Sequence, residues 1–396
     1  MDRKLNVGVI FGSRSVEHDV SIVTASQVMK ALNPAKYNVI PIYIARNGLW
    51  YTGPNLTQLK NFTIDNIADL AGTKETHLSP NANYPGIITP PTAGLFGKND
   101  FKALDVAFPV IHGTHGEDGT LQGVFEMANL PYVGAGVLAS AIANDKAMTK
   151  TVLKAHGLPV LDKYIHFTRR EWLANRHQIL EKVEEIGFPA FVKPLTLGSS
   201  IGIARVEDRD KAALHIDIAA NLDRQVLVEQ AVVGNMVEIN CAVLGNEEVR
   251  ASTLEQPVTY EEYLTFGQKY MGNASAGMKS QERVIPAPIG DELTQKIKEA
   301  GVATFKAIRG RGTARIDFLL SKDTQQFWVN EINTLPGSLA FYLWEPEDLS
   351  PTAVCDELIQ LAMEEHSEKR HTTYDYKSGL IELAATRGAK GLKAKA

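Results

Sequence analysis

The chain has 396 residues, of which 44% are hydrophobic and 22% are charged, and its formal net charge is −5 at pH 7. These proportions are typical of a folded globular protein and exclude an intrinsically disordered chain. The negative charge argues against a dedicated nucleic-acid-binding protein, which would be basic. At about 150 residues per domain, the length predicts a chain of two or three domains.

The sequence gives no sign of a membrane or secreted protein. It has no stretch near the ~18 consecutive apolar residues that a membrane helix needs. The apolar run Val7–Phe11 is too short for a secretory signal and reads better as a first strand. Two cysteines, Cys241 and Cys355, cannot build a disulfide framework, which favours a reducing compartment. We therefore expect a cytoplasmic enzyme with no membrane or nucleic-acid partner.

Strand-like apolar runs alternate with amphipathic stretches along the chain, which is the pattern of an α/β protein. Strands are predicted at 6–11, 37–44, 105–111, 188–193, 201–206, 225–229 and 237–244. Helices are predicted at 19–32, 120–128, 137–156 and 293–308. Asn33-Pro34 and Gly157 supply stop signals for the first and third of these helices.

Three segments lack this regularity. Residues 52–98 are rich in Asn, Thr, Gly and Pro and predict an irregular insertion. Residues 260–283 show no regular apolar spacing and predict a long loop. From Tyr374 the tail carries scattered basic residues and few large apolar side chains, which predicts a frayed end.

Two alternating segments, 313–320 and 328–333, predict a hairpin that carries charge on one face. If the hairpin folds about Thr324, Asp317 lies opposite Glu331 and Arg315 lies opposite Asn333. Two opposed carboxylates repel each other across a sheet, so a positive group should lie between them. Carboxylate and amide oxygens without a neighbouring His or Cys suit a hard cation such as Mg2+.

The alternative for this hairpin is a solvated face on which Arg315 simply neutralises Asp317. The next residues, 334–338, form a turn whose backbone N–H groups could meet an anion, and this favours the metal interpretation.

The segment 193–202 joins two predicted strands through Gly and Ser residues. Glycines let a backbone approach a ligand closely, and hydroxyl and N–H groups suit phosphate oxygens. A plain hairpin turn is an equal alternative, because the segment lacks the P-loop pattern. Lys146, Lys193 and Lys269 are candidate phosphate ligands, although each alone could be a surface lysine.

Two more turns carry charged side chains. The segment 112–119 contains His112, Glu117 and Asp118 before a predicted helix. It has no helical metal-ligand spacing, so an anion at the helix N-terminus is favoured over zinc. In the turn 12–19, Glu17 lies near a helix start, where it could cap the helix or bind a ligand; spacing alone leaves both open.

Taken in chain order, these segments resemble D-alanine–D-alanine ligases of the ATP-grasp superfamily. The resemblance is carried by GSRSVEHDVS at 12–21, HGTHGEDGTLQG at 112–123, NDK at 144–146, VKPLTLGSSIG at 192–202, QKY at 268–270, RID at 315–317 and NEINTLPG at 330–337. It extends from about Val7 to Trp344 and so covers most of the chain.

The resemblance implies a three-domain ATP-grasp fold with the nucleotide clamped between the central and C-terminal domains. The expected parts are an N-terminal α/β domain over 1–134 with the insertion, a central subdomain over 135–230, a C-terminal subdomain over 231–366 and a tail over 367–396. It also implies a reaction in which the carboxylate of one D-alanine attacks the γ-phosphate of ATP. The amine of a second D-alanine then attacks the acyl phosphate, and phosphate leaves.

Position by position, the resemblance assigns roles around the nucleotide. Asp317, Glu331 and Asn333 would ligate two Mg2+ ions, for which Mn2+ could substitute. The remaining assignments are Lys146, Lys193 and Lys269 at the phosphates, Ser199 and Ser200 in the loop over ATP, Glu229 and Val232 beside the adenine, and Glu238 on the ribose.

The resemblance also assigns the reacting groups. Arg315 and the Gly337 N–H would face the developing oxyanion. Glu17 would hold the ammonium of the first D-alanine, with His112 nearby. A hydrogen-bonded set of Glu17, Ser199 and Tyr270 would link this site to the loop that closes over ATP and excludes water.

One departure from the family concerns the second substrate. The family has a serine near the carboxylate of that substrate, and an ungapped count places Tyr342 at its position. Either Tyr342 or Ser338 replaces the hydroxyl, or the acceptor is another amino acid or D-lactate. Tyr270 is retained, which favours an amine nucleophile. A regulatory module that binds nucleotide without chemistry is the alternative from another class, and family members are commonly homodimers.

Overall fold

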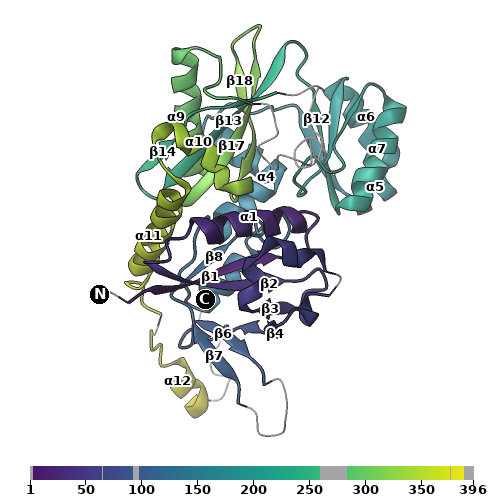
Figure 1. Cartoon of the computed structure of the whole chain (residues 1–396). Helices are drawn as coiled ribbons and strands as arrows, with labels where there is room; N and C mark the ends of the chain where they lie inside the picture. Colours follow the sequence, from purple (N-terminus) through teal and green to yellow (C-terminus); the bar gives the residue numbers. More distant parts are fainter. Residues whose placement is uncertain (1–2, 65, 92–97, 259–282, 375, 388–396) are drawn as a thin grey trace.

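A computed structural model describes residues 3–64, 66–91, 98–258, 283–374 and 376–387 (Figure 1). Three main sheets of five, four and four strands follow one another along the chain. The predicted α/β class is therefore confirmed. Within the described ranges, no helix is long and apolar enough to cross a membrane.

The N-terminal sheet has the strand order β4-β3-β2-β1-β8. Its parallel strands β1 (Leu5–Gly12), β2 (Tyr37–Ile44) and β8 (Val106–Pro109) match the predicted strands. Helix α1 (His18–Ala31) connects β1 to β2, and α2 (Thr120–Met127) follows β8. Because β1 and β8 are parallel neighbours, the turns after them, 12–17 and 110–119, meet at one edge of the sheet.

The segment predicted as an irregular insertion carries more structure than expected. The short strands β3 (Trp50–Thr52) and β4 (Lys74–Glu75) extend the N-terminal sheet, and three 3-10 turns lie between them. Strands β5 (His77–Leu78), β6 (Gly86–Thr89) and β7 (Asp100–Ala103) form a separate small sheet. These elements are too short to impose a visible period on the sequence, which is why the pattern failed to indicate them.

The helix predicted at 137–156 is two helices, α3 (Val137–Asn144) and α4 (Lys146–Ala155). Asp145 separates them in an extended conformation with ψ 103°. Its side chain accepts hydrogen bonds from the backbone N–H groups of Ala147 and Met148, so Asp145 is the N-cap of α4. The prediction of one continuous helix was wrong because the cap lies inside an otherwise helical pattern.

The central sheet is antiparallel, with the strand order β11-β10-β12-β9. It consists of β9 (Tyr164–Thr168), β10 (Ala190–Pro194), β11 (Ala204–Val206) and β12 (Gln225–Gln230). Helices α5 (Arg169–Ala174), α6 (Arg176–Ile186) and α7 (Arg209–Leu222), which the sequence analysis missed, accompany the sheet on its outer side (Figure 1). A core that includes Trp172, Val183 and Ile216 joins these helices to the sheet.

The third sheet has the order β14-β13-β17-β18. It consists of β13 (Met236–Gly245), β14 (Val249–Ala251), β17 (Gly312–Ser321) and β18 (Phe327–Asn333), and a separate pair, β15 (Gln256–Pro257) and β16 (Arg283–Val284), lies next to it in the chain. Helix α9 (Asp291–Ala307) packs on one face through Ile297 and Phe305, against Ile316 and Phe318. The opposite face is left for polar side chains.

The C-terminal helices return to the beginning of the chain. After α10 (Phe341–Trp344), helix α11 (Pro351–Lys369) places Val354 and Leu358 in the same core as Val7 and Val28 (Figure 1). The tail that was expected to be frayed contains a further helix, α12 (Leu380–Arg387), whose Leu380 and Ile381 are exposed.

Candidate active site

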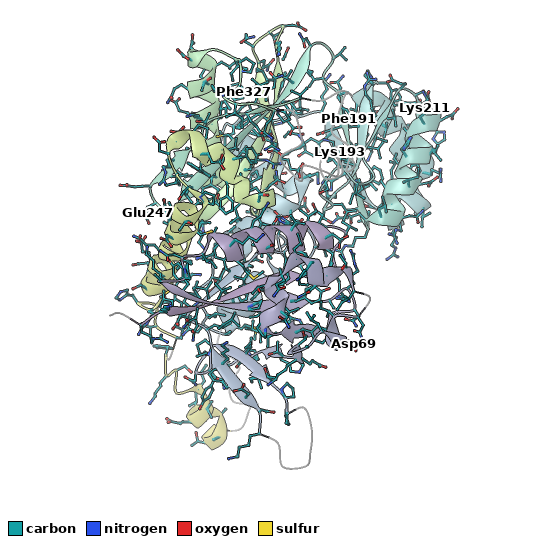
Figure 2. The ribbon with its side chains drawn as sticks, in the orientation of Figure 1. Asp69, Phe191, Lys193, Lys211, Glu247 and Phe327 are labelled. Carbon is teal, nitrogen blue, oxygen red and sulfur yellow. The ribbon has the colours of Figure 1, made fainter. Side chains whose placement is uncertain are left out.

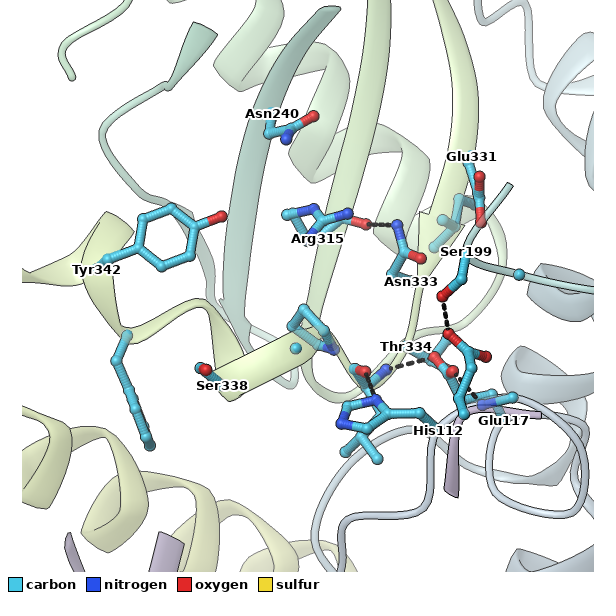
Figure 3. Close-up of a pocket in the computed structure, with 18 of the residues that line it drawn as sticks. His112, Glu117, Ser199, Asn240, Arg315, Glu331, Asn333, Thr334, Ser338 and Tyr342 are labelled. Carbon is cyan, nitrogen blue, oxygen red and sulfur yellow. Dashed lines mark hydrogen bonds between the residues drawn. The ribbon is translucent and has the colours of Figure 1, made fainter. Parts of the chain in front are cut away.

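A cavity of about 1000 Å3 lies where the three main sheets meet. The cavity is lined by side chains from the N-terminal turns, from the segment 196–199 and from the polar face of the third sheet (Figure 3). Eleven of the candidate residues line its wall: Glu17, His112, Lys146, Ser199, Glu238, Arg315, Glu331, Asn333, Gly337, Ser338 and Tyr342. Figure 2 shows Lys193 on the side of the central sheet that faces this region, opposite Lys211 on α7.

The predicted hairpin register is confirmed. Arg315 pairs with Asn333 and Asp317 pairs with Glu331 across β17 and β18. The register then shifts by one residue: Phe318 pairs with Val329, and Asn330 is skipped in a β-bulge. Side chains two apart share a face, so the four polar residues lie together, and the register of β13 adds Glu238 and Asn240 to the same face.

Arg315 and Asp317 form a paired ion contact within this face. Nε of Arg315 donates to Oδ1 of Asp317 at 2.6 Å, and Nη2 donates to Oδ2 at 2.7 Å. Asn333 Nδ2 donates to the same Oδ2 at 2.9 Å. Burial alone would lower the pKa of Arg315, but Asp317 outweighs it and holds that pKa well above its ordinary value. The neutralisation of Asp317 by Arg315, which was the alternative to a metal site, is therefore present, in a buried rather than a solvated setting.

The donor set on this face fits a hard divalent cation. Two opposed carboxylates, Asp317 and Glu331, stand beside the amide of Asn333, whose Oδ1 remains available because Nδ2 bonds Asp317. Oxygen donors of this kind suit Mg2+, which also keeps room for phosphate oxygens. The described ranges contain no cluster of three or more His, Cys, Asp or Glu side chains that could hold a metal ion, so the donor set on this face consists of two acids and one amide.

The loop between β10 and β11 is held by Lys146, the first residue of α4. Nζ of Lys146 donates to the carbonyl oxygen of Leu197 at 2.7 Å and lines the cavity. Burial lowers the pKa of this lysine. Ser199 and Ser200 have positive φ angles of 55° and 58°, so the loop turns sharply at the pair. Ser199 lines the cavity, whereas Ser200 does not.

Lys193 and Glu229 form a buried ion cluster with Lys150, outside the cavity wall. Glu229 is 1% exposed and pairs with both lysines, with Lys150 Nζ at 2.8 Å from Oε2. Burial would raise the pKa of Glu229, but the two lysines outweigh it and lower that pKa to about 2. The sequence analysis did not find Lys150, because a lysine in a predicted helix is ordinarily an exposed surface residue. Val232 also lies outside the cavity wall, whereas Glu238 lines it.

Glu17 joins the N-terminal turns to the central loop. The Ser199 hydroxyl donates to Oε1 of Glu17, and Glu17 is 5% exposed. Gly113 leaves the room for this carboxylate, because a Cβ atom there would lie 2.4 Å from Glu17 Oε2. Two of the three members of the predicted hydrogen-bonded set are therefore together. Tyr270, the third member, and Lys269 lie outside the described residues.

His112 and Glu117 fix the turn that contains Gly337. Nδ1 of His112 donates to the carbonyl oxygen of Leu335 at 2.8 Å, and Nε2 accepts from the Thr24 hydroxyl at 2.9 Å. Glu117 Oε1 accepts from the Leu335 N–H at 2.9 Å. Burial lowers the pKa of His112 to about 4, so its imidazole is neutral. Burial and Glu17 raise the pKa of Glu117 to about 8.

A further polar group lines the cavity beyond Arg315. Tyr342 and Asn240 lie there (Figure 3), and Glu255 and Arg283 line the same cavity. Ser338 lines the wall next to Gly337. The sequence analysis did not find Glu255, Asn240 or Arg283, because no local spacing connects them.

Comparisons with known proteins agree with this geometry. Models of the N-terminal and C-terminal parts of D-Ala–D-Ala ligases match residues 6–135 and 152–360. The D-alanine–D-alanine ligase of Geobacillus thermodenitrificans is 38% identical over 379 residues, which cover 94% of this chain and 99% of that protein. The corresponding ligase of Natranaerobius thermophilus is 36% identical over 385 residues, with 94% and 99% covered.

Two solved structures show the same architecture. The D-alanine–D-alanine ligase of Coxiella burnetii matches with a TM-score of 0.77 and 29% identity, over 97% of this chain and 99% of that one. The D-Ala:D-Ser ligase of Enterococcus faecalis matches with a TM-score of 0.76 and 30% identity, over 91% and 100%. The expected ATP-grasp fold is therefore confirmed. Through its sequence, its fold and the order of its motifs, the chain belongs to the D-alanine–D-alanine ligase family.

Proposed function

We propose that this protein joins two D-alanine molecules in an ATP-dependent reaction and supplies D-alanyl-D-alanine for peptidoglycan synthesis in the cytoplasm. The observation that carries the proposal is the polar face of the third sheet. Arg315, Glu331 and Asn333 line the cavity together with Gly337, and Asp317, on the same face, bonds Arg315 and Asn333. Phosphoryl transfer depends on positioning and charge compensation, which such a group supplies.

In the first step, a carboxylate oxygen of the first D-alanine attacks the γ-phosphorus of ATP, and ADP leaves. Two Mg2+ ions held by Asp317, Glu331 and Asn333 would neutralise phosphate charge, and Mn2+ could replace them. Lys146 is supported in this role by its position at the cavity wall. Lys193 and Lys269 would also contact phosphates, with Ser199 and Ser200 in the covering loop.

The remaining nucleotide contacts follow from the family assignment. Glu229 and Val232 would lie beside the adenine, and Glu238 would bind the ribose. The pairing of Glu229 with Lys150 and Lys193 supports a fixed and ionised carboxylate at that end of the site.

In the second step, the amine of the second D-alanine attacks the acyl carbon, and phosphate leaves from the tetrahedral intermediate. Arg315 and the N–H of Gly337 would stabilise the oxyanion. Glu17 would hold the ammonium of the first D-alanine, and Ser199 and Tyr270 would connect Glu17 to the loop over ATP. The hydrogen bonds of His112 support a role in positioning the Gly337 turn, because Nδ1 bonds the Leu335 carbonyl oxygen and Nε2 bonds the Thr24 hydroxyl.

The variant Glu331→Ala tests the metal assignment. We expect it to reduce the rate of ADP formation with D-alanine by at least about a thousandfold, because charge compensation at the phosphates is lost. Glu185→Ala, which removes an exposed acid from α6, should leave the rate unchanged. Full activity in Glu331→Ala with an unchanged melting temperature would refute the assignment.

A ligase with a different acceptor is the second candidate, and Tyr342 at the serine position favours it. The neighbouring ligase from Enterococcus faecalis is named for D-serine, so D-serine belongs in the comparison. Incubation with D-alanine, ATP and Mg2+ plus a panel of amino and hydroxy acids distinguishes the two candidates. A higher kcat/KM with an acceptor other than D-alanine would favour the second.

A nucleotide-binding module without chemistry is the third reading, and the complete Arg315 to Asn333 group argues against it. Phosphate release that stays at background with every acceptor would restore it. We further propose a homodimer, which sedimentation velocity would test: a single species of one-chain mass would contradict it.

A further inference from the structure

Glu255 is a buried acid at the end of the cavity, beyond Arg315, and the steps above do not use it. It is 3% exposed and lines the cavity. Its backbone forms two hydrogen bonds with the backbone of Asn240 on β13, at 2.9 and 3.1 Å. Since Asn240 pairs with Asp317 on its other edge, β13 lies between Glu255 and β17, the strand that carries Arg315.

The two carboxylate oxygens of Glu255 have different surroundings. Oε1 accepts from the Tyr342 hydroxyl at 2.5 Å and from Asn240 Nδ2 at 3.0 Å. Oε2 lies 3.6 Å from Nη1 of Arg283, which is an ion-pair distance rather than a hydrogen bond. A carboxylate can accept about four hydrogen bonds, so Oε2 retains acceptor capacity.

A second buried acceptor lies at the same place. Asn240 is 4% exposed and lines the cavity, and its Oδ1 has no hydrogen-bond partner within the described part of the chain. A buried polar atom without a partner is costly, and in a binding site it indicates a donor on the ligand. Glu255 and Asn240 therefore offer two acceptors, one of them charged, to a cationic N–H donor.

Tyr342 is held in place by a strained turn and by Arg283. Ser338, Leu339 and Ala340 are consecutive left-handed residues with φ angles of 52°, 49° and 50°. Each such residue other than glycine costs about 1 kcal/mol, and strain of this kind concentrates at functional sites. The turn leads into α10, where the guanidinium of Arg283 lies 3.9 Å from the centre of the Tyr342 ring. The Tyr342 hydroxyl consequently points toward Asn240 and Arg315 (Figure 3).

The charges at this end of the cavity match a zwitterion. Arg283 and Arg315 offer positive charge to a carboxylate, and Glu255 offers negative charge to an ammonium group. An α-amino acid carries both groups a few ångströms apart. An α-hydroxy acid such as lactate carries only the carboxylate, so its uncharged hydroxyl would donate to Glu255 without the ion-pair attraction of an ammonium group.

We propose that Glu255 is a specificity-determining residue that binds the ammonium group of the second substrate and selects α-amino acids over α-hydroxy acids. Tyr342 and Asn240 are the positioning residues that direct the Glu255 carboxylate. This inference rests on the proposed ligase function, and it assigns the acceptor preference to a residue outside the family motifs described above.

The test compares the wild type with Glu255→Gln, which keeps the shape of the side chain and removes its charge. Dipeptide and ester formation are measured by mass spectrometry with D-alanine, D-serine and D-lactate as competing acceptors. We expect the KM for the second D-alanine to rise roughly 10- to 100-fold, the loss of a charge-assisted hydrogen bond. The KM values for ATP and for the first D-alanine should stay within about twofold, and the ester-to-dipeptide ratio should rise at least tenfold.

Two further variants separate binding from a structural effect. Tyr342→Phe, which removes one hydrogen bond to Glu255 and keeps the ring, should shift the same KM in the same direction by a smaller factor. Glu247→Gln, in the exposed turn between β13 and β14, should match the wild type in every measurement.

The outcomes are distinguishable. An unchanged amino-to-hydroxy preference in Glu255→Gln, or an equal rise in all three KM values, would overturn the inference and leave the ligase function standing. A wild type that prefers D-lactate would also overturn it. A wild type that forms no product with any acceptor would refute the ligase function itself, and the inference with it.

Discussion

His112 is a buried imidazole whose two nitrogens are both used within the protein. Because Nδ1 donates to Leu335 and Nε2 accepts from Thr24, the neutral form fits and the protonated form does not. Its pKa in the folded chain is about 4, below its ordinary value of 6.5. The stability contributed by neutral His112 is therefore fully present above pH 6.5 and is lost as the pH falls toward 4.

This linkage predicts how His112→Gln differs from the wild type. Between pH 7 and pH 4 the wild type should lose about 3 kcal/mol of unfolding free energy relative to the variant, at ~1.4 kcal/mol per pKa unit. Urea unfolding at several pH values measures the difference. His177→Gln, an exposed histidine on α6, is the control. A difference between His112→Gln and the wild type that does not change with pH would contradict the linkage.

Lys150 is a buried cation that has a well-matched control on the same helix. Its side chain is 4% exposed and pairs with Glu229, whereas Lys154, one turn later, is 66% exposed. Removing one member of a buried ion pair costs about 3–5 kcal/mol. We expect Lys150→Met to lose about 3 kcal/mol of unfolding free energy and to raise the KM for ATP about tenfold. If Lys150→Met and Lys154→Met behave alike, the ion cluster has no role.

The sequence could reveal some of these residues and not others. Arg315, Asp317, Glu331 and Asn333 followed from local alternation on two strands joined by a short turn. Glu117 contacts Leu335, which lies 218 residues further along the chain, and Glu255 contacts Tyr342, 87 residues further. Spacing carries no information over such separations, so these contacts required the structure.

Among the elements, the break between α3 and α4 positions Lys146, which holds the loop between β10 and β11. Asp145 caps α4, and the next residue, Lys146, holds the Leu197 carbonyl oxygen. We expect Asp145→Ala to lose about 1–2 kcal/mol of unfolding free energy, which Asp145→Ser should largely restore. Asp145→Ala should also raise the KM for ATP several-fold, because the backbone of Lys146 is no longer fixed by the cap of α4.

A second cap provides the control for this prediction. Asp208 caps α7 on the outer side of the central sheet and accepts from the Lys211 N–H. Asp208→Ala should lose a similar free energy without changing the KM for ATP. An equal KM effect in the two variants would show that Asp145 acts only through general stability.

Most strands were predictable because their apolar runs are bounded by Gly and Pro turns, as for β1, β2 and β13. The helices α5 to α7 were missed, and the α3–α4 break was hidden, because capping geometry is invisible to apolar periodicity. The tail helix α12 was missed because the scattered basic residues of the tail suggested a frayed end.

Across the whole molecule, the cavity wall contains residues from α1 and the N-terminal turns, from the loop after β10 and from the third sheet. A ligand that binds there connects parts of the chain that are far apart in sequence, and it stabilises only the folded state. A non-hydrolysable ATP analogue with Mg2+ at a hundred times its Kd should contribute about 2.7 kcal/mol to stability. We expect EDTA, or Asp317→Asn, to remove most of the rise in melting temperature. A rise that is independent of Mg2+ would contradict the metal assignment.

The order of motifs along the chain was enough to predict the ATP-grasp architecture. It did not indicate that α11 returns to pack Val354 and Leu358 against the N-terminal core, since that helix carries none of the motifs. The closure of the molecule around its site therefore depends on packing that only the structure displays.

We propose that D-alanine is converted to an acyl phosphate in this cavity and that its acyl group is then transferred to an amine. Isotope transfer from D-alanine labelled with 18O in its carboxylate tests it most directly. We expect one labelled oxygen in each released phosphate, with equal amounts of ADP and of dipeptide. Unlabelled phosphate, or ADP formed without dipeptide, would contradict it.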